Sequence, residues 1–195
     1  MSGPDVHPIE AESYRIMASR VDLSDWPPGA RDVVARLIHA SADLEYATTT
    51  VIGEHAVPAA VDALRRGAPI VTDVTMVGAG ITGGSSVSYL SELGGPVPAG
   101  VTRSAAAMQV AAERHPEGAL VVVGCAPTAL FEVLRLDWRP AAVIGLPVGF
   151  VGAAESKQAL RESPLAPIAI SNVGEKGGSA VAAAAVNALR RIARA

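Results

Sequence analysis

The sequence predicts one domain of the three-layer αβα class, in which a mainly parallel five-stranded sheet lies between two layers of helices. Its 195 residues suit a single domain over positions 1–195. Half of the residues are hydrophobic but only 4% are aromatic, so the core has to be built from Val, Leu, Ile and Ala. That composition fits a parallel sheet covered on both faces by alanine-rich helices. Strands alternate with helices from residue 69 onward, which indicates parallel pairing through right-handed crossovers.

Each element is predicted from a local pattern. Apolar runs bounded by turn residues predict strands over residues 69–77, 87–90, 119–124, 141–146 and 167–171, of which 87–90 is the weakest. Periodic apolar positions predict helices over residues 9–20, 31–46, 56–66, 102–115, 127–136, 153–161 and 179–193. Gly67 is well placed to end the third helix, and Thr102 or Ser104 to begin the fourth. Pro127 stands near the first position of the fifth helix, where its missing N–H is tolerated.

Charge and composition exclude several classes of protein. The net charge is −3, and no basic block is long enough to indicate nucleic-acid binding. Arg190, Arg191 and Arg194 form a small basic end, but they close a helix and favour its C-terminus. Cys125 is the only cysteine, which rules out an internal disulfide and a multi-cysteine zinc site. A buried structural thiol is the favoured interpretation of Cys125, because it ends an apolar strand.

Targeting signals and metal motifs are also absent from the sequence. The first seven residues are polar and lack the basic-then-apolar pattern of a secretory leader. No apolar run approaches the ~20 residues that a membrane helix needs. No histidine–carboxylate cluster indicates a metal site. We therefore expect a cytoplasmic protein that binds neither a membrane nor a metal.

The helix over residues 31–46 carries the side chains best suited to chemistry. Apolar residues recur along it at helical spacing, at Val33, Leu37, Ala40 and Leu44. Arg36, His39 and Asp43 recur on the other side, so their side chains can meet. Histidine has the unperturbed pKa nearest neutrality, so His39 beside a carboxylate and an arginine is a candidate proton donor. Spacing alone favours the plainer interpretation, a solvated helix face.

Loops rich in glycine, serine and threonine follow most of the predicted strands. Ligands of open α/β sheets bind beyond the carboxyl ends of the strands, where these loops would lie. Helix N-termini with free N–H groups favour anions there. A ligand with several carboxylates or phosphates fits such a rim, although each loop alone can be an ordinary turn. The loops are Asp73 to Gly80, Gly124 to Thr128, Gly145 to Gly152 and Ser171 to Ser179.

One of these loops matches a dinucleotide-binding pattern only superficially. Residues 78–83 read Gly-Ala-Gly-Ile-Thr-Gly and follow a predicted strand. A nicotinamide site needs a helix next and an acidic residue about 20 positions on. Residues 84–89 favour coil or strand instead, and the next acid, Glu92, comes too early. We therefore expect no nicotinamide binding.

Several blocks along nearly the whole chain resemble the precorrin-8X methylmutase family of cobalamin biosynthesis. The two most specific blocks are residues 36–43, Arg-Leu-Ile-His-Ala-Ser-Ala-Asp, and residues 145–157, which run from Gly-Leu-Pro-Val-Gly to Glu-Ser-Lys. The others come in the family's order, at residues 9–17, 73–77 with Gly80-Ile81, 102–107, 126–130 and 176–179. The resemblance outweighs the plainer interpretation of His39.

The resemblance implies a homodimer with a flavodoxin-like fold. Five predicted strands suit the strand order of that fold. It implies an isomerase that moves a methyl group from C-11 to C-12 of precorrin-8X to give hydrogenobyrinate, with no metal or organic cofactor. The family's catalytic histidine falls on His39, the proposed proton donor to the ring C nitrogen. Ser13 and Arg36 would contact the substrate, and Arg103 would be a further carboxylate anchor. If Asp43 pairs with His39, its charge would favour the imidazolium.

Two alternatives and one departure stay open. The same rearrangement on cobalt-precorrin-8 is the nearest alternative, because that metal would arrive with the substrate. A tetrapyrrole-binding paralogue without turnover is the other. Glu175 stands where the family commonly has a basic residue before its lysine, which puts one carboxylate contact in doubt. The segment from Gly80 to Glu92 is short and rich in glycine and serine, so ligand contacts there are also in doubt.

Overall fold

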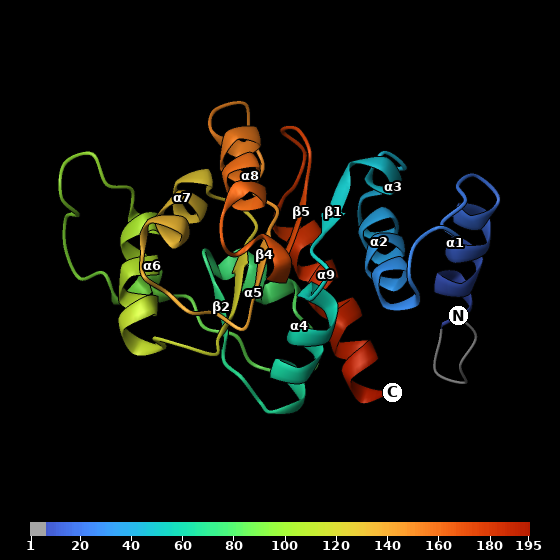
Figure 1. Cartoon of the computed structure of the whole chain (residues 1–195), viewed down its shortest axis with the longest axis horizontal. Coiled ribbons are helices and arrows are strands. Elements are labelled where there is room, and N and C mark those ends of the chain that lie inside the picture. Colours follow the sequence, from blue (N-terminus) through green and yellow to red (C-terminus); the bar gives the residue numbers. More distant parts are fainter. Residues whose placement is uncertain (1–6) are drawn as a thin grey trace.

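The computed structural model describes residues 7–195, and a five-stranded sheet forms their centre (Figure 1). Residues 1–6, which belong to the segment without a leader pattern, lie outside the described residues. The strand order is β1-β5-β4-β3-β2. The last four strands of the chain are parallel, and β1 pairs antiparallel with β5 at the edge. The strands are β1 Thr50–Ile52, β2 Ile70–Thr72, β3 Leu120–Val123, β4 Ala142–Gly145 and β5 Ala169–Asn172.

The strand order decides which helices cover which face. Strands β2 to β5 lie in the order of the chain, so crossovers of one hand place the three longer connecting helices on the same face. These are α6 Arg103–Arg114, α7 Pro127–Arg135 and α8 Ala153–Glu162. The opposite face is covered by α2 Pro28–Ser41, α4 Ala56–Arg65 and α9 Ser179–Arg194, and the short α5, Thr75–Gly80, packs against α9 there. The predicted three layers and mainly parallel sheet are confirmed, whereas the order differs from the flavodoxin-like 2-1-3-4-5.

Neighbouring residues of each central strand feed two separate cores. Leu120 and Val122 of β3 pack with α2, α4 and α9, whereas Val121 and Val123 pack with α6, α7 and α8. All four side chains are fully buried, as expected of a parallel sheet covered on both faces. Buried alanines line much of α9, and small side chains let that helix lie close to the sheet and to α2. The aromatic-poor composition thus becomes a closely packed aliphatic core.

The N-terminal helices form one end of the molecule (Figure 1). Helix α1, Pro8–Ala18, begins at His7, whose Nδ1 accepts a hydrogen bond from the N–H of Ile9 at 3.2 Å. It packs on α2 without burying any residue completely. Helix α2 is shorter than the predicted 31–46 segment, because Ala42 adopts a left-handed conformation with φ 55°. A short helix, α3 Tyr46–Thr49, leads from there into β1.

Two of the predicted strands are wrong in extent or kind. The predicted strand at 69–77 ends at Thr72, and the chain continues into α5, Thr75–Gly80. The predicted strand at 87–90 is reduced to one bridge between Val71 and Val87, followed by the 3₁₀ helix η1, Tyr89–Glu92. The first strand was predicted too long because its β-branched residues continue to Val77, just before Gly78 and Gly80. Strand β1 was not predicted, because three residues are too few to show a period.

Apart from those of α2, the predicted helix ends lie within two residues of the ends in the structure. Thr102 is the residue that caps α6, and its Oγ1 accepts a hydrogen bond from the N–H of Ala105 at 3.2 Å. Gly67 follows α4 with φ 73°, the conformation that glycine adopts at the end of a helix. A second 3₁₀ helix, η2 Ala166–Ile168, precedes β5. None of the helices in residues 7–195 is both long and apolar enough to cross a membrane.

Candidate active site around His39

His39 lies in the last turn of α2, on the side that faces α1. Leu37 and Ile38 bury the inner face of the helix, while His39 stays half-buried. Its Nδ1 lies 2.9 Å from Oγ of Ser13. The ring of Tyr14 stacks on the imidazole, with ring centroids 4.8 Å apart and planes 12° apart. Within residues 7–195 no hydrogen bond reaches Nε2 of His39, which leaves that nitrogen able to exchange a proton with a ligand.

Two arginines and one glutamate lie beside His39. Arg36, one turn earlier on α2, donates to Oε1 of Glu10 at 2.5 Å and to the hydroxyl of Tyr14 at 3.3 Å. Arg191 of α9 donates to the same Glu10 oxygen at 2.9 Å. Arg191 was not among the predicted site residues, because it stands with Arg190 and Arg194 in a basic helix end. No local sequence pattern could have indicated this contact, since Glu10 and Arg191 are 181 residues apart.

The charges around His39 act on it in opposite directions. Burial lowers the pKa of His39, and the positive charges of Arg36 and Arg191 lower it further. The carboxylate of Glu10 acts the other way and raises the pKa. For Glu10 itself, burial opposes ionisation, but its bonds to Arg191 and Arg36 bring its pKa below the usual value. The net result is a histidine whose imidazolium is a stronger acid than that of free histidine.

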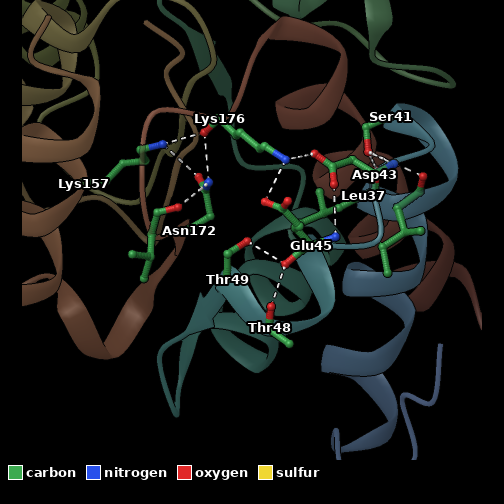
Figure 2. Close-up of polar contacts among 11 residues, drawn as sticks. Leu37, Ser41, Asp43, Glu45, Thr48, Thr49, Lys157, Asn172 and Lys176 are labelled. Carbon is green, nitrogen blue, oxygen red and sulfur yellow. Dashed lines mark hydrogen bonds and ion pairs between the residues drawn. The ribbon is translucent and has the colours of Figure 1, made fainter. Parts of the chain in front are cut away.

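The structure contradicts the hypothesis that Asp43 pairs with His39. Helix α2 ends at Ser41, so Asp43 leaves the helical face that would have brought it under His39. Its Oδ2 instead accepts a hydrogen bond from Nζ of Lys176 at 2.6 Å, and Glu45 accepts another from the same nitrogen at 2.8 Å (Figure 2). The bond from Lys176 is the main reason why the pKa of Asp43 is lowered. Asp43 therefore holds a loop and does not set the charge of His39.

A buried lysine fixes the loop that carries Lys176. Nζ of Lys157 donates to the backbone oxygen of Lys176 at 2.5 Å and to Oδ1 of Asn172 at 3.0 Å (Figure 2). Asn172 also donates to the Lys176 oxygen at 2.9 Å. Burial and the nearby charge of Arg161 lower the pKa of Lys157 to about 8. The exposed Glu175 lies in this loop, and its charge partly opposes that shift.

One rim loop of the sheet carries its own anion. The buried carboxylate of Asp73 accepts hydrogen bonds from the N–H groups of Gly124, Cys125 and Ala126 at 2.8–3.0 Å. Burial raises the pKa of Asp73, and those N–H groups counteract the increase. The expectation that a ligand anion uses the N–H groups before α7 is therefore wrong for these three residues. The prediction that Cys125 is a buried thiol is wrong, because the residue follows β3 at the rim of the sheet and is exposed. Partial desolvation and the charge of Asp73 raise its thiol pKa, which does not suit a nucleophile.

Arg103 is not brought to His39 within one chain. Its guanidinium donates to the carbonyls of Leu90, Leu93 and Gly95 at 3.1–3.2 Å, so it holds the loop before α6. Helix α6, which begins at Arg103, lies at the end of the molecule opposite α1 and α2 (Figure 1). Of the predicted site residues, the structure thus groups Ser13, Arg36 and His39. In residues 7–195 no three His, Cys, Asp or Glu side chains gather as a metal site would require.

Comparison with known proteins identifies the family. The family model described as Precorrin-8X methylmutase matches residues 8–192. The chain belongs to this family. Its members are isomerases of cobalamin biosynthesis, as the resemblance of the sequence blocks implied.

Relatives with both substrate names match over almost their full length. The Precorrin-8X methylmutase of Sinorhizobium is 40% identical over 96% of this chain and 95% of that protein. The Cobalt-precorrin-8 methylmutase of Salmonella typhimurium is 39% identical over 93% of this chain and 92% of its own. A crystal structure of the precorrin-8x methyl mutase from Thermus thermophilus superposes with a TM-score of 0.84 at 38% identity, covering 95% of both chains. Relatives of both names match equally well, so similarity does not distinguish their substrates.

Proposed function

We propose that this isomerase moves a methyl group from C-11 to C-12 of precorrin-8X to give hydrogenobyrinate, with His39 as the proton donor to the ring C nitrogen. One bond from carbon to the methyl group breaks and another forms, so no atom is gained and no redox equivalent is needed. The observation that carries the proposal is the state of the His39 ring. Nδ1 is engaged by Ser13, whereas Nε2 has no partner in residues 7–195.

The surroundings of His39 suit proton donation. A serine hydroxyl can donate to a neutral imidazole or accept from an imidazolium, so Ser13 can hold the ring in both protonation states. The lowered pKa of His39 makes its imidazolium a stronger acid than that of free histidine, although a smaller fraction of the ring is protonated near neutral pH. Arg36, one turn away, uses Nη1 for its bonds to Glu10 and Tyr14, and its other N–H donors suit the acetate and propionate groups of a corrinoid. Ser13 and Arg36 are accordingly proposed to contact the substrate.

The decisive test is the conversion of precorrin-8X, followed by visible absorbance, with wild type and His39→Ala side by side. We expect turnover by the wild type and a loss of about 10²–10⁴-fold in the variant, the usual contribution of general acid catalysis. Circular dichroism establishes that the variant is folded. Equal turnover by both proteins would exclude His39 as the donor. Product binding without turnover by either would favour the tetrapyrrole-binding paralogue.

The cobalt-containing substrate is the second candidate, because relatives carry that name at similar identity. The same assay with cobalt-precorrin-8 separates the two. A higher kcat/KM for the metal-free substrate supports the proposal, and a higher value for the cobalt form supports the alternative. Because the metal comes with the substrate, neither result requires a metal site in the protein.

A homodimer is proposed as the working assembly. If Arg103 contacts the same substrate as His39, it does so from a second copy of the chain, because α6, which begins at Arg103, lies at the end of the molecule opposite α1 and α2 (Figure 1). Mixing inactive His39→Ala with inactive Arg103→Gln should then restore about a quarter of wild-type activity. About half of the dimers contain one chain of each variant, and one of the two sites in such a dimer has both His39 and Arg103 intact. No restoration would mean that each chain works alone or that Arg103 has no such role.

A further inference from the structure

A cavity of about 430 Å³ lies on a part of α9 that His39 does not face. Its charged lining comes from Arg65 at the end of α4 and from Arg190 and Arg194, one turn apart on α9. Gly84 and Ser85 of the loop after α5 close it from another side. Arg191, which contacts Glu10 beside α1 and α2, is not among the residues that line it. The cavity is thus separate from the candidate active site.

The three arginines of this cavity have no carboxylate partner within residues 7–195. Their hydrogen bonds go to backbone carbonyls instead: Arg65 to Ala193 at 3.1 Å, Arg194 to Gly83 at 2.9 Å, and Arg190 also to Gly83. By contrast, Arg66 beside Arg65 is paired with Asp62 at 2.8 Å. A guanidinium has five N–H donors, so one carbonyl satisfies only a small part of each. The protein thus gathers three positive charges here while its net charge is −3.

Two further observations concern the lining of the cavity. Nε of Arg190 is buried and has no hydrogen-bond partner in the described part of the chain. Buried donors are nearly always paired, so Arg190 keeps hydrogen-bonding capacity that no residue of the described chain uses. The glycines at positions 83 and 84 also fit this arrangement, because a Cβ on either would collide with the guanidinium of Arg194 or Arg190. The end of the dinucleotide-like motif at 78–83 therefore makes room for arginines.

We propose that this cavity, the α4–α9 arginine cavity, binds a small multivalent oxyanion, either a phosphate ester or a polycarboxylate. Planar guanidinium groups bind both kinds of anion through paired N–H donors. The C-terminus of α9 repels anions through its partial negative charge, but three arginines outweigh that effect. The volume exceeds that of a single phosphate, so the ligand carries a further polar group toward Ser85. The site is independent of the proposed reaction at His39.

Binding of inorganic phosphate and of citrate to the full-length protein tests the proposal. Calorimetry and thermal unfolding are measured in each anion and in potassium chloride at equal ionic strength. We expect saturable binding by the wild type and by the control Arg66→Gln. In Arg190→Gln/Arg194→Gln, affinity should fall by about tenfold or more, because each substitution removes charge-assisted hydrogen bonds. Stronger binding of phosphate identifies a phosphate ester, and stronger binding of citrate a polycarboxylate.

A second variant keeps the test independent of helix α9. Ser85→Asp places a carboxylate at the exposed mouth of the cavity and should abolish anion binding without altering the core. The proposal is overturned if phosphate and citrate act on the wild type only as potassium chloride does. It is also overturned if the double variant and Ser85→Asp bind as well as Arg66→Gln.

Discussion

Oγ of Ser13 lies 2.9 Å from Nδ1 of His39, although the two residues are 26 positions apart and belong to different helices. This contact joins α1 to the last turn of α2. It holds the imidazole by Nδ1 and leaves Nε2, which has no partner in residues 7–195, for a ligand. Tyr14 supports the same ring from its face. The position of α1 is therefore part of the candidate active site, even though α1 adds no fully buried residue to the core.

Ser13→Ala should lower kcat by about tenfold, the value of one lost hydrogen bond at the reacting group. The reason is that His39 would lose the partner that fixes its ring in both protonation states. The measurement is the visible absorbance assay at saturating substrate. Ser19→Ala, just after the other end of α1, is the matched control, because within residues 7–195 the Ser19 hydroxyl bonds only to the carbonyl of Ile16. An effect of equal size in both variants would assign the loss to α1 in general.

Glu10→Gln should lower the pKa of His39, because it removes the negative charge that raises this pKa and keeps the positive charges of Arg36 and Arg191. The direct measurement is an NMR titration of the His39 ring. In the wild type we expect a value below 6.5, and in the variant a lower one still. If the imidazolium is the donor, kcat/KM falls as pH rises through this pKa, and the fall moves to lower pH in the variant.

Glu12→Gln is the matched control for that titration. Glu12 lies on the same helix, but it pairs with Arg15 at 2.6 Å and is exposed. The His39 titration should be unchanged there. A wild-type pKa above 6.5 would contradict the charge arrangement found around His39.

Asp43→Asn should leave the pH–rate profile unchanged, because Asp43 bonds to Lys176 and not to His39. A small effect on stability is expected instead, below about 1 kcal/mol, since the ion pair is partly exposed. The pKa of Asp43 is lowered in the folded protein, so its contribution is complete above pH 3.8 and disappears as pH falls through the folded value. Urea unfolding at pH 7 and pH 3 measures it. A shifted pH–rate profile in Asp43→Asn would instead support the hypothesis that Asp43 pairs with His39.

Lys157→Met should destabilise the fold by about 1–3 kcal/mol, because the Lys176 carbonyl and Asn172 lose a buried donor. The pKa of Lys157 is lowered to about 8, whereas the unfolded chain keeps its proton up to about 10.5. Relative to this variant, the wild type should therefore gain stability as pH rises from 8 to 10.5. Urea unfolding across that range checks the sign. Gln158→Met is the control, since Gln158 bonds only to the exposed Glu162.

The sequence by itself determined the α/β class, the two helical layers and the position of His39 on a helix. It could do so because burial leaves a local period: the run of β3 and the stripe on α2 are each visible within a few residues. The helix end at Thr102 and the turn at Gly67 follow from equally local chemistry. The same kind of local pattern predicted too long a strand at residues 69–77. The strand ends at Thr72, but β-branched residues continue into α5.

Only the tertiary structure decided which charged groups meet. Glu10 joins Arg36 and Arg191, and Asp43 joins Lys176, across 26 to 181 residues of chain. Such pairs depend on how α1, α2 and α9 pack, and a single left-handed residue, Ala42, was enough to turn Asp43 away from His39. Strand β1 likewise exists only because β5 offers it an antiparallel edge. Side-chain periods record burial, whereas ion pairs between distant elements depend on geometry that no local pattern contains.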